Sequence, residues 1–317
     1  MADAVCLCET YLRATERAAL AGARWLGRAD QESAEESAQS GMHAAIDSFP
    51  INGRVVVGMG EESVTVGAGG PDVDLALDPL EGRGVVARGG NGAISMIVVT
   101  EPGNLLSLPD MYMRTIAVGP RARGAIGLLR PVGDNVRAIA EAYGRNTGDV
   151  TTIVLDRTRH HDLIDDIRAA GARIKLIQDG TVTAAISAAI RGTNDHLAIG
   201  IGGTRQAVLT AGALRCLGGE VQAQLWPTSR REIEAAREHG IEDIEQVFTT
   251  EDLVSGEVIV AATGVSNGDL LRGVRFLADS ARTHSLIMCT RCNWVRFVDG
   301  IHFFARDRRE EVRLLGF

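Results

Sequence analysis

The stretch TTIVLDRTRHHDLIDDIRAAGARIKLI, residues 151–177, contains a complete unit of strand, helix and strand. Its two ends are short runs of β-branched and aliphatic residues, and its middle has apolar residues at helical spacing. The alternation continues with a helix-like run at 181–190, a strand-like run at 197–201 and a helix-like run at 205–219. Because this order is typical of a parallel sheet with crossover helices, the C-terminal half is predicted to be an α/β layer.

The N-terminal half has a different order of predicted elements. Two segments with apolar residues at helical spacing come first, and three short strand-like runs separated by glycines follow. The helical segments are residues 10–27 and 33–49, and the strand-like runs are 55–58, 73–77 and 94–99. We therefore expect an α/β fold with an α+β half at residues 1–148, an α/β half at 149–317, and the functional site between them.

The composition excludes several classes of protein. The 317 residues are 45% hydrophobic and 23% charged, as in globular chains that bury a sizeable core. A formal charge of −8 argues against a nucleic-acid or membrane partner. The N-terminal MADAVCLCETYL lacks the pattern of a signal peptide, and no run approaches the roughly 18 apolar residues of a membrane span. We expect a cytoplasmic protein.

The five cysteines are an odd number, which does not predict a disulfide framework. Cys289 and Cys292 have the spacing of a redox or zinc pair. A zinc site needs a second pair of ligands, and none at a comparable spacing stands out. We therefore interpret Cys289 and Cys292 as reduced cysteines at a strand end.

Carboxylates gather in VDLALDPLEGRG, residues 73–84. Asp74 and Asp78 share a parity on the expected strand, so both project to one face, where uncompensated charges would repel each other. Mg²⁺ or Mn²⁺, which take oxygen ligands, would relieve this repulsion. Elsewhere, Glu35 has an ordinary explanation in a charged first helical turn, and Glu61 has one in a plain turn.

Basic residues follow the strand at 151–155. Arg157 and Arg159 come directly after it, at the carboxyl end where open α/β sheets bind ligands. Glycine-bearing loops at 178–181 and 200–204 end the next two strands and converge on the same edge. Arginines can hold a phosphate through paired hydrogen bonds, so this edge is predicted to bind phosphate.

The motifs also occur in a recognisable order. They are WLGR at 25–28, GMGE at 58–61, DPLEG at 78–82, PDMYM at 109–113, GIGG at 200–203 and ATG at 262–264. This order resembles the class II fructose-1,6-bisphosphatases of bacteria over residues 10–306. The resemblance implies the layered α-β-α-β-α fold of the lithium-sensitive sugar and inositol phosphatases. It also implies Mg²⁺ or Mn²⁺, hydrolysis of the 1-phosphate of a ketose bisphosphate, and a homodimer or homotetramer.

By this resemblance, two groups of positions form the site. The residues implied to hold the sugar phosphate are Tyr112, Arg157 in place of a lysine, Arg159, Asp179 and Gly203. The residues at retained or conservatively replaced metal positions are Glu35, Asp78 and Glu81. Three metal-side positions are changed: Met59 and Gln206 replace metal-binding glutamates, and Arg83 replaces the threonine that helps to activate water.

These changes predict weak or absent binding of the divalent cation. They remove two carboxylates and add a guanidinium, and a thioether is a poor ligand for Mg²⁺. We expect Arg83 to occupy the space of a metal and to pair with Asp78 or Glu81.

Three functions remain open. The first is phosphatase-type hydrolysis of a sugar phosphate or bisphosphate, with a metal held by Glu35, Asp78, Glu81 and Glu61. The second is a metal-independent elimination or isomerisation, with Asp78 or Glu81 as general base and Arg83 as electrostatic stabiliser. The third is non-catalytic binding of a sugar phosphate.

Overall fold

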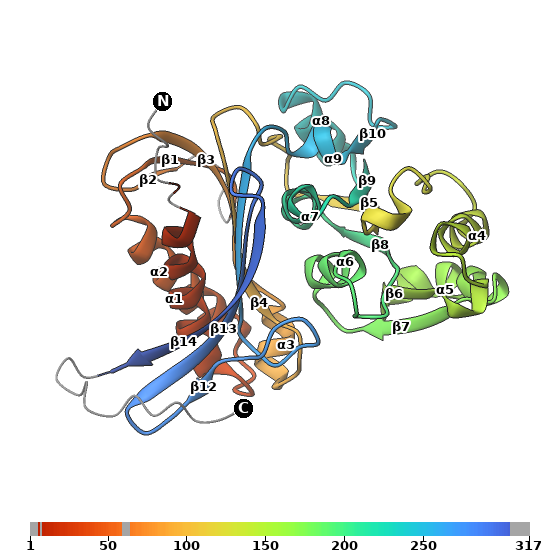
Figure 1. The fold of residues 1–317 in the computed structure, drawn as a ribbon. Coiled ribbons are helices and arrows are strands. Elements are labelled where there is room, and N and C mark those ends of the chain that lie inside the picture. Colours follow the sequence, from red (N-terminus) through yellow and green to blue (C-terminus); the bar gives the residue numbers. More distant parts are fainter. Residues whose placement is uncertain (1–5, 7, 59–63, 305–317) are drawn as a thin grey trace.

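The computed structural model describes residues 6, 8–58 and 64–304. It has two β-sheets and three layers of helices, stacked alternately (Figure 1). From one side to the other, the helical layers are α1 (Leu12–Gly22) with α2 (Gln31–Ile46), then α6 (Thr181–Ala189) with α7 (Thr204–Leu217), then α4 (Val132–Tyr143) with α5 (His161–Ala169). The predicted α/β fold is confirmed, and so is its layered form.

The first sheet lies between the outer helices α1 and α2 and the central helices. Its strand order is β12-β13-β11-β4-β3-β1-β2, and β14 pairs with β13. The strands are β1 (Asn52–Val57), β2 (Thr65–Val66), β3 (Asp72–Glu81), β4 (Ile94–Thr100), β11 (Val258–Gly264), β12 (Arg275–Phe276), β13 (Ser280–Cys289) and β14 (Trp294–Phe303). Strand β3 runs parallel to β1 and antiparallel to β4.

The second sheet has the order β10-β9-β5-β8-β6-β7. Its strands are β5 (Tyr112–Val118), β6 (Thr151–Leu155), β7 (Arg173–Ile177), β8 (Leu197–Gly203), β9 (Glu220–Leu225) and β10 (Val247–Thr249). The predicted parallel arrangement holds for β6, β7 and β8, whereas β5 is antiparallel to both β8 and β9. The sheet is therefore mixed.

The other described α-helices lie toward the ends of the layers (Figure 1). They are α3 (Arg83–Arg88), α8 (Arg230–Glu238) and α9 (Thr250–Leu253). The helical segment expected at 10–27 is interrupted: α1 ends at Gly22 and a 3₁₀ turn at Ala23–Trp25 follows. Among the described helices, none is long and apolar enough to cross a membrane.

Strand membership does not follow the boundary expected at residues 148 and 149. Strand β5 precedes that boundary but joins the second sheet, and β11 to β14 follow it but join the first. Strand β11 lies between β4 and β13 because its apolar residues suit a buried central position. Hydrophobic periodicity carries no information about which sheet a strand joins.

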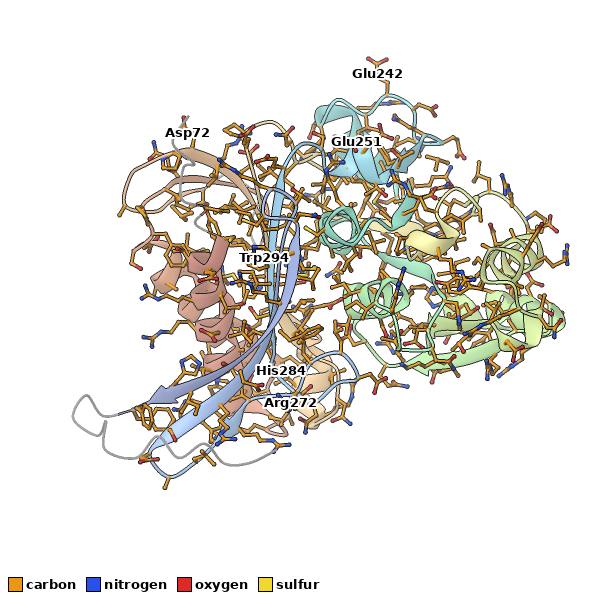
Figure 2. All side chains as sticks on the ribbon, viewed as in Figure 1. Asp72, Glu242, Glu251, Arg272, His284 and Trp294 are labelled. Atoms are coloured by element: carbon orange, nitrogen blue, oxygen red, sulfur yellow. The ribbon has the colours of Figure 1, made fainter. Side chains whose placement is uncertain are left out.

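The core fixes the direction in which β3 presents its side chains. Leu75 and Leu77 pack with the buried residues of α1 and α2, whereas Ala76 packs with those of α6 and α7. Side chains fill the space between the layers (Figure 2). Even-numbered positions of β3 up to Asp78 therefore face the second sheet.

Candidate active site

The two buried carboxylates at the end of β3 belong to Asp78 and Glu81, residues that are only 2% and 4% exposed. They differ in parity, so a regular strand would send them to opposite faces. The pairing with β4 shifts between Asp78 and Glu81, at Pro79, which has no N–H for the ladder. This irregularity turns both carboxylates toward the central helices.

Glu81 meets the N-terminus of α6. Its Oε1 accepts the Val182 N–H at 3.0 Å and the Thr181 hydroxyl at 3.4 Å. Its Oε2 is buried and has no hydrogen-bond partner among the described residues. Burial raises the pKa of Glu81 to about 8, and the charge of Asp78 adds to the shift. Glu81 is therefore a buried carboxylate with one free oxygen, poised to exchange a proton near neutral pH.

Asp78 meets the N-terminus of α7. Its Oδ2 accepts the Gln206 amide at 3.1 Å and lies 3.5 Å from Nε of Arg205. Burial raises the pKa of Asp78, and the charge of Arg205 opposes this rise. Arg205 was missed from the sequence, although its place beside the substituted Gln206 was a usable signal.

Arg83 pairs with a different carboxylate from the one expected. The prediction that it binds Asp78 or Glu81 is wrong, because its guanidinium forms an ion pair with Glu35 of α2. Gly82, with φ of 93°, turns the chain out of β3 and directs Arg83 toward α2. The cation that contacts Asp78 is Arg205 instead.

Asp74 shares the face of Asp78, as predicted, but takes no part in the site. Arg54 binds both of its oxygens at 2.8 Å, and the Gly103 N–H donates at 2.7 Å. The expected repulsion between Asp74 and Asp78 is therefore relieved by an arginine rather than by a metal.

The predicted phosphate residues lie on one edge of the second sheet. Arg157 and Arg159 follow β6, and Tyr112 begins β5 directly opposite Gly203 of β8. The Arg159 guanidinium is 5.1 Å from the centre of the Tyr112 ring, and its Nη2 donates to the Ile201 carbonyl at 3.0 Å. Tyr112 is 44% exposed, so the edge is open to a ligand.

His160 anchors the loop that carries the two arginines. Its Nδ1 lies 2.9 Å from the Leu155 carbonyl, and its Nε2 accepts the Ile201 N–H at 2.8 Å. Burial lowers the pKa of His160, in keeping with a neutral ring. Gly200 leaves room for this ring, because a Cβ would lie 3.2 Å from His160 Nε2. His160 is thus a positioning residue.

Asp179 and Gly203 connect the two groups of residues. Asp179 precedes α6, and its charge is one cause of the raised pKa of Glu81. It also lines a cavity of about 360 Å³ together with Arg88 and Gln178. A Cβ on Gly203 would lie 2.5 Å from Gln206 Oε1, so glycine leaves room for the amide that reaches Asp78.

The sequence matches the family described as bacterial fructose-1,6-bisphosphatase, glpX-encoded, over residues 6–302. The chain belongs to the class II fructose-1,6-bisphosphatase family. A D-fructose 1,6-bisphosphatase class 2/sedoheptulose 1,7-bisphosphatase of Synechococcus sp. (strain JA-3-3Ab) is 40% identical over 92% of this chain and 94% of its own. A protein of the same name from Synechococcus sp. (strain JA-2-3B'a(2-13)) is 40% identical with the same coverage.

A third relative, at lower identity, has a similar name. The D-fructose 1,6-bisphosphatase class 2/sedoheptulose 1,7-bisphosphatase 2 of Acaryochloris marina (strain MBIC 11017) is 35% identical over 95% of this chain and 96% of its own. The resemblance predicted from the motifs is confirmed, and as a member of a phosphatase family this protein is an enzyme.

The described residues do not fit a tightly held Mg²⁺ or Mn²⁺. Asp78 is engaged by Gln206 and Arg205, and Glu35 by Arg83. Among residues 6, 8–58 and 64–304, no three carboxylates bring ligand atoms close enough to share one ion. Met59 and Glu61, the other predicted positions, lie outside the described residues.

Proposed function

We propose that this enzyme hydrolyses one phosphate ester of a sugar bisphosphate without a tightly held divalent cation. The observation that carries the proposal is that two groups contact the segment at the start of α6: the Arg157 guanidinium donates to the Gln178 carbonyl, and Glu81 accepts an N–H of the first helical turn. Arg157, Arg159 and Tyr112 form a cationic edge on one sheet, and Asp78 and Glu81 form a buried acidic end on the other. The names of the relatives make fructose 1,6-bisphosphate and sedoheptulose 1,7-bisphosphate the first substrates to test.

The cationic edge suits the phosphate that is not cleaved. Arg157 and Arg159 present donors to a dianion where backbone carbonyls already orient their guanidinium groups. The ring of Tyr112 lies beside the Arg159 guanidinium and is open to the sugar. Binding energy from this remote phosphate would position the second ester at the acidic end.

At the acidic end, Glu81 is the proposed general base. Its Oε2, buried and without a partner among the described residues, takes a proton from the water that enters with the substrate as the water oxygen attacks phosphorus, and the bond from phosphorus to the sugar oxygen breaks. The leaving sugar oxygen takes a proton from solvent. Arg205 and Arg83 supply positive charge near the transferring phosphoryl group, where such a family site would use a metal.

A second candidate is acid-base chemistry on carbon. The pairing of Asp78 and Glu35 with arginines leaves Glu81 to act without a cation, and a base of raised pKa can remove a proton from carbon as well as from water. Elimination or isomerisation of a sugar phosphate would then use the same cationic edge.

Phosphate release in water labelled with heavy oxygen distinguishes hydrolysis from acid-base chemistry on carbon. The unmodified protein should release one inorganic phosphate from each ketose bisphosphate and none from fructose 6-phosphate. Attack of water on phosphorus should place one heavy oxygen in the released phosphate, seen by phosphorus NMR. Elimination breaks the bond between carbon and oxygen, so unlabelled phosphate would contradict hydrolysis. Consumption of substrate with no phosphate release would also contradict it and would favour isomerisation.

A further inference from the structure

Four of the five cysteines meet at one point of the first sheet. Cys6 and Cys8 lie at the N-terminal end, Cys289 ends β13, and Cys292 lies in the turn before β14. Their sulfur atoms all lie within 4.8 Å of one another. We call these residues the four-cysteine cluster. Cys289 and Cys292 are free and Cys289 ends a strand, as interpreted, but the second pair that the sequence did not reveal, Cys6 and Cys8, lies beside them.

The distances match a tetrahedral metal rather than disulfides. The sulfurs of Cys6 and Cys289 are 3.7 Å apart, and those of Cys8 and Cys292 are 3.9 Å apart. A zinc ion with four bonds to sulfur of ~2.3 Å places its ligands about 3.8 Å from each other. A disulfide needs sulfurs only about 2.0 Å apart, and all four cysteines are free.

The local backbone supports thiolate ligands. The Cys292 N–H points at the Cys289 sulfur at 3.4 Å, a donor that favours a negative charge on sulfur. Asn293, with φ of 52°, then turns the chain into β14, which begins at Trp294, labelled in Figure 2. The turn holds the second pair of cysteines against the first.

We propose that the four-cysteine cluster binds one Zn²⁺ in a tetrahedral site made only of thiolates. Each thiol loses a proton to solvent as its sulfur binds the ion, so four protons leave for each zinc. Soft thiolates select zinc over the hard cations Mg²⁺ and Mn²⁺. With four protein ligands, no position is open for substrate, so the role is structural.

The ion would fasten the start of the chain to its far end in sequence. The 3₁₀ turn Cys8–Tyr11 leads directly into α1, which packs on β11 and β13. The zinc would tie this entry to the β13–β14 hairpin, across a sequence separation of more than 280 residues. Loss of the ion should lower the melting temperature, because a link across so long a loop removes much freedom from the unfolded chain.

Metal analysis of the full-length protein tests the site. Protein purified with reductant should contain one zinc per chain, and the double variant Cys6→Ser, Cys8→Ser should contain none. Cys216→Ser is the matched control, because Cys216 lies outside the cluster with its sulfur directed at the Val258 carbonyl. This control should keep its zinc.

Cobalt provides a readout that needs no variant. Unmodified protein stripped of metal under reducing conditions should develop the intense visible absorption of tetrahedral cobalt thiolate when Co²⁺ is added, and one equivalent of Zn²⁺ should bleach it. Absence of this absorption would overturn the proposal. Equal zinc content in the double variant and in the unmodified protein would overturn it too.

Discussion

Replacing Arg159 with alanine should raise the KM for a ketose bisphosphate by about 10- to 150-fold, since a hydrogen bond to a charged group contributes ~1.5–3 kcal/mol. Arg159 is held by the Ile201 carbonyl beside Tyr112, so its loss removes a donor that is already oriented toward the ligand. The change should leave the melting temperature of the free protein almost unaltered, because the side chain lies at an open edge. Steady-state kinetics with a ketose bisphosphate measure KM. Thermal-shift assays with and without fructose 6-phosphate measure the melting temperature and its rise on binding.

Two controls separate phosphate binding from a general loss of charge. Arg168→Ala removes an exposed arginine of α5 that pairs with Asp165, and it should leave KM unchanged. Arg159→Lys keeps the charge but loses the paired donors, so its KM should lie between the values for the unmodified protein and for Arg159→Ala. If Arg159→Ala binds sugar phosphates as well as the unmodified protein does, the cationic edge is not the phosphate site.

Glu81→Gln should lower kcat by roughly 10²- to 10⁴-fold, the range associated with general acid-base catalysis. The unmodified enzyme should gain activity as pH rises through about 8, because a base must be ionised and burial raises the pKa of Glu81 to about 8. The variant should lose this pH dependence. Glu36→Gln, on the exposed side of α2, should keep normal kinetics.

As pH rises, the stability of the folded protein should fall while its activity increases. The pKa of Glu81 is higher in the folded protein than in the unfolded chain, so the folded state binds the extra proton. The unmodified protein therefore loses stability as pH rises from the unfolded value toward 8, and Glu81→Gln escapes this loss. A variant that is inactive and also less stable at pH 9 would indicate a structural role for Glu81 and would contradict its assignment as base.

The sequence predicted the parts of the fold that depend on local pattern. The runs at 73–77, 151–155 and 197–201 all lie in strands, and the helix-like run at 181–190 contains α6. The order of strands was not predictable in this way. Strand β11 joins β4 and β13 of the first sheet although residues of the second sheet precede it, and that choice depends on tertiary packing.

The candidate site shows the same limit. The sequence predicted the residue types and the sheet edge on which Arg157 and Arg159 lie, because parallel strands end at one edge whatever their partners. The ion-pair partners of these residues could not be predicted from the sequence. Arg83 reaches Glu35 and Arg205 reaches Asp78, and these pairings depend on the turn at Gly82 and on the start of α7. The nearness of Cys6 and Cys8 to Cys289 and Cys292 was missed for the same reason, since the fold alone brings them together.

The most direct test of the proposed function is phosphate release by the unmodified protein, measured with Mn²⁺ and after brief exposure to a chelator. Zinc content is measured in the same samples, so that loss of the structural ion is distinguished from loss of a catalytic one. Because arginines engage Asp78 and Glu35, we expect the two rates to agree within a few-fold. Release that requires Mn²⁺ and disappears with chelator, while zinc stays bound, would contradict hydrolysis without a tightly held cation.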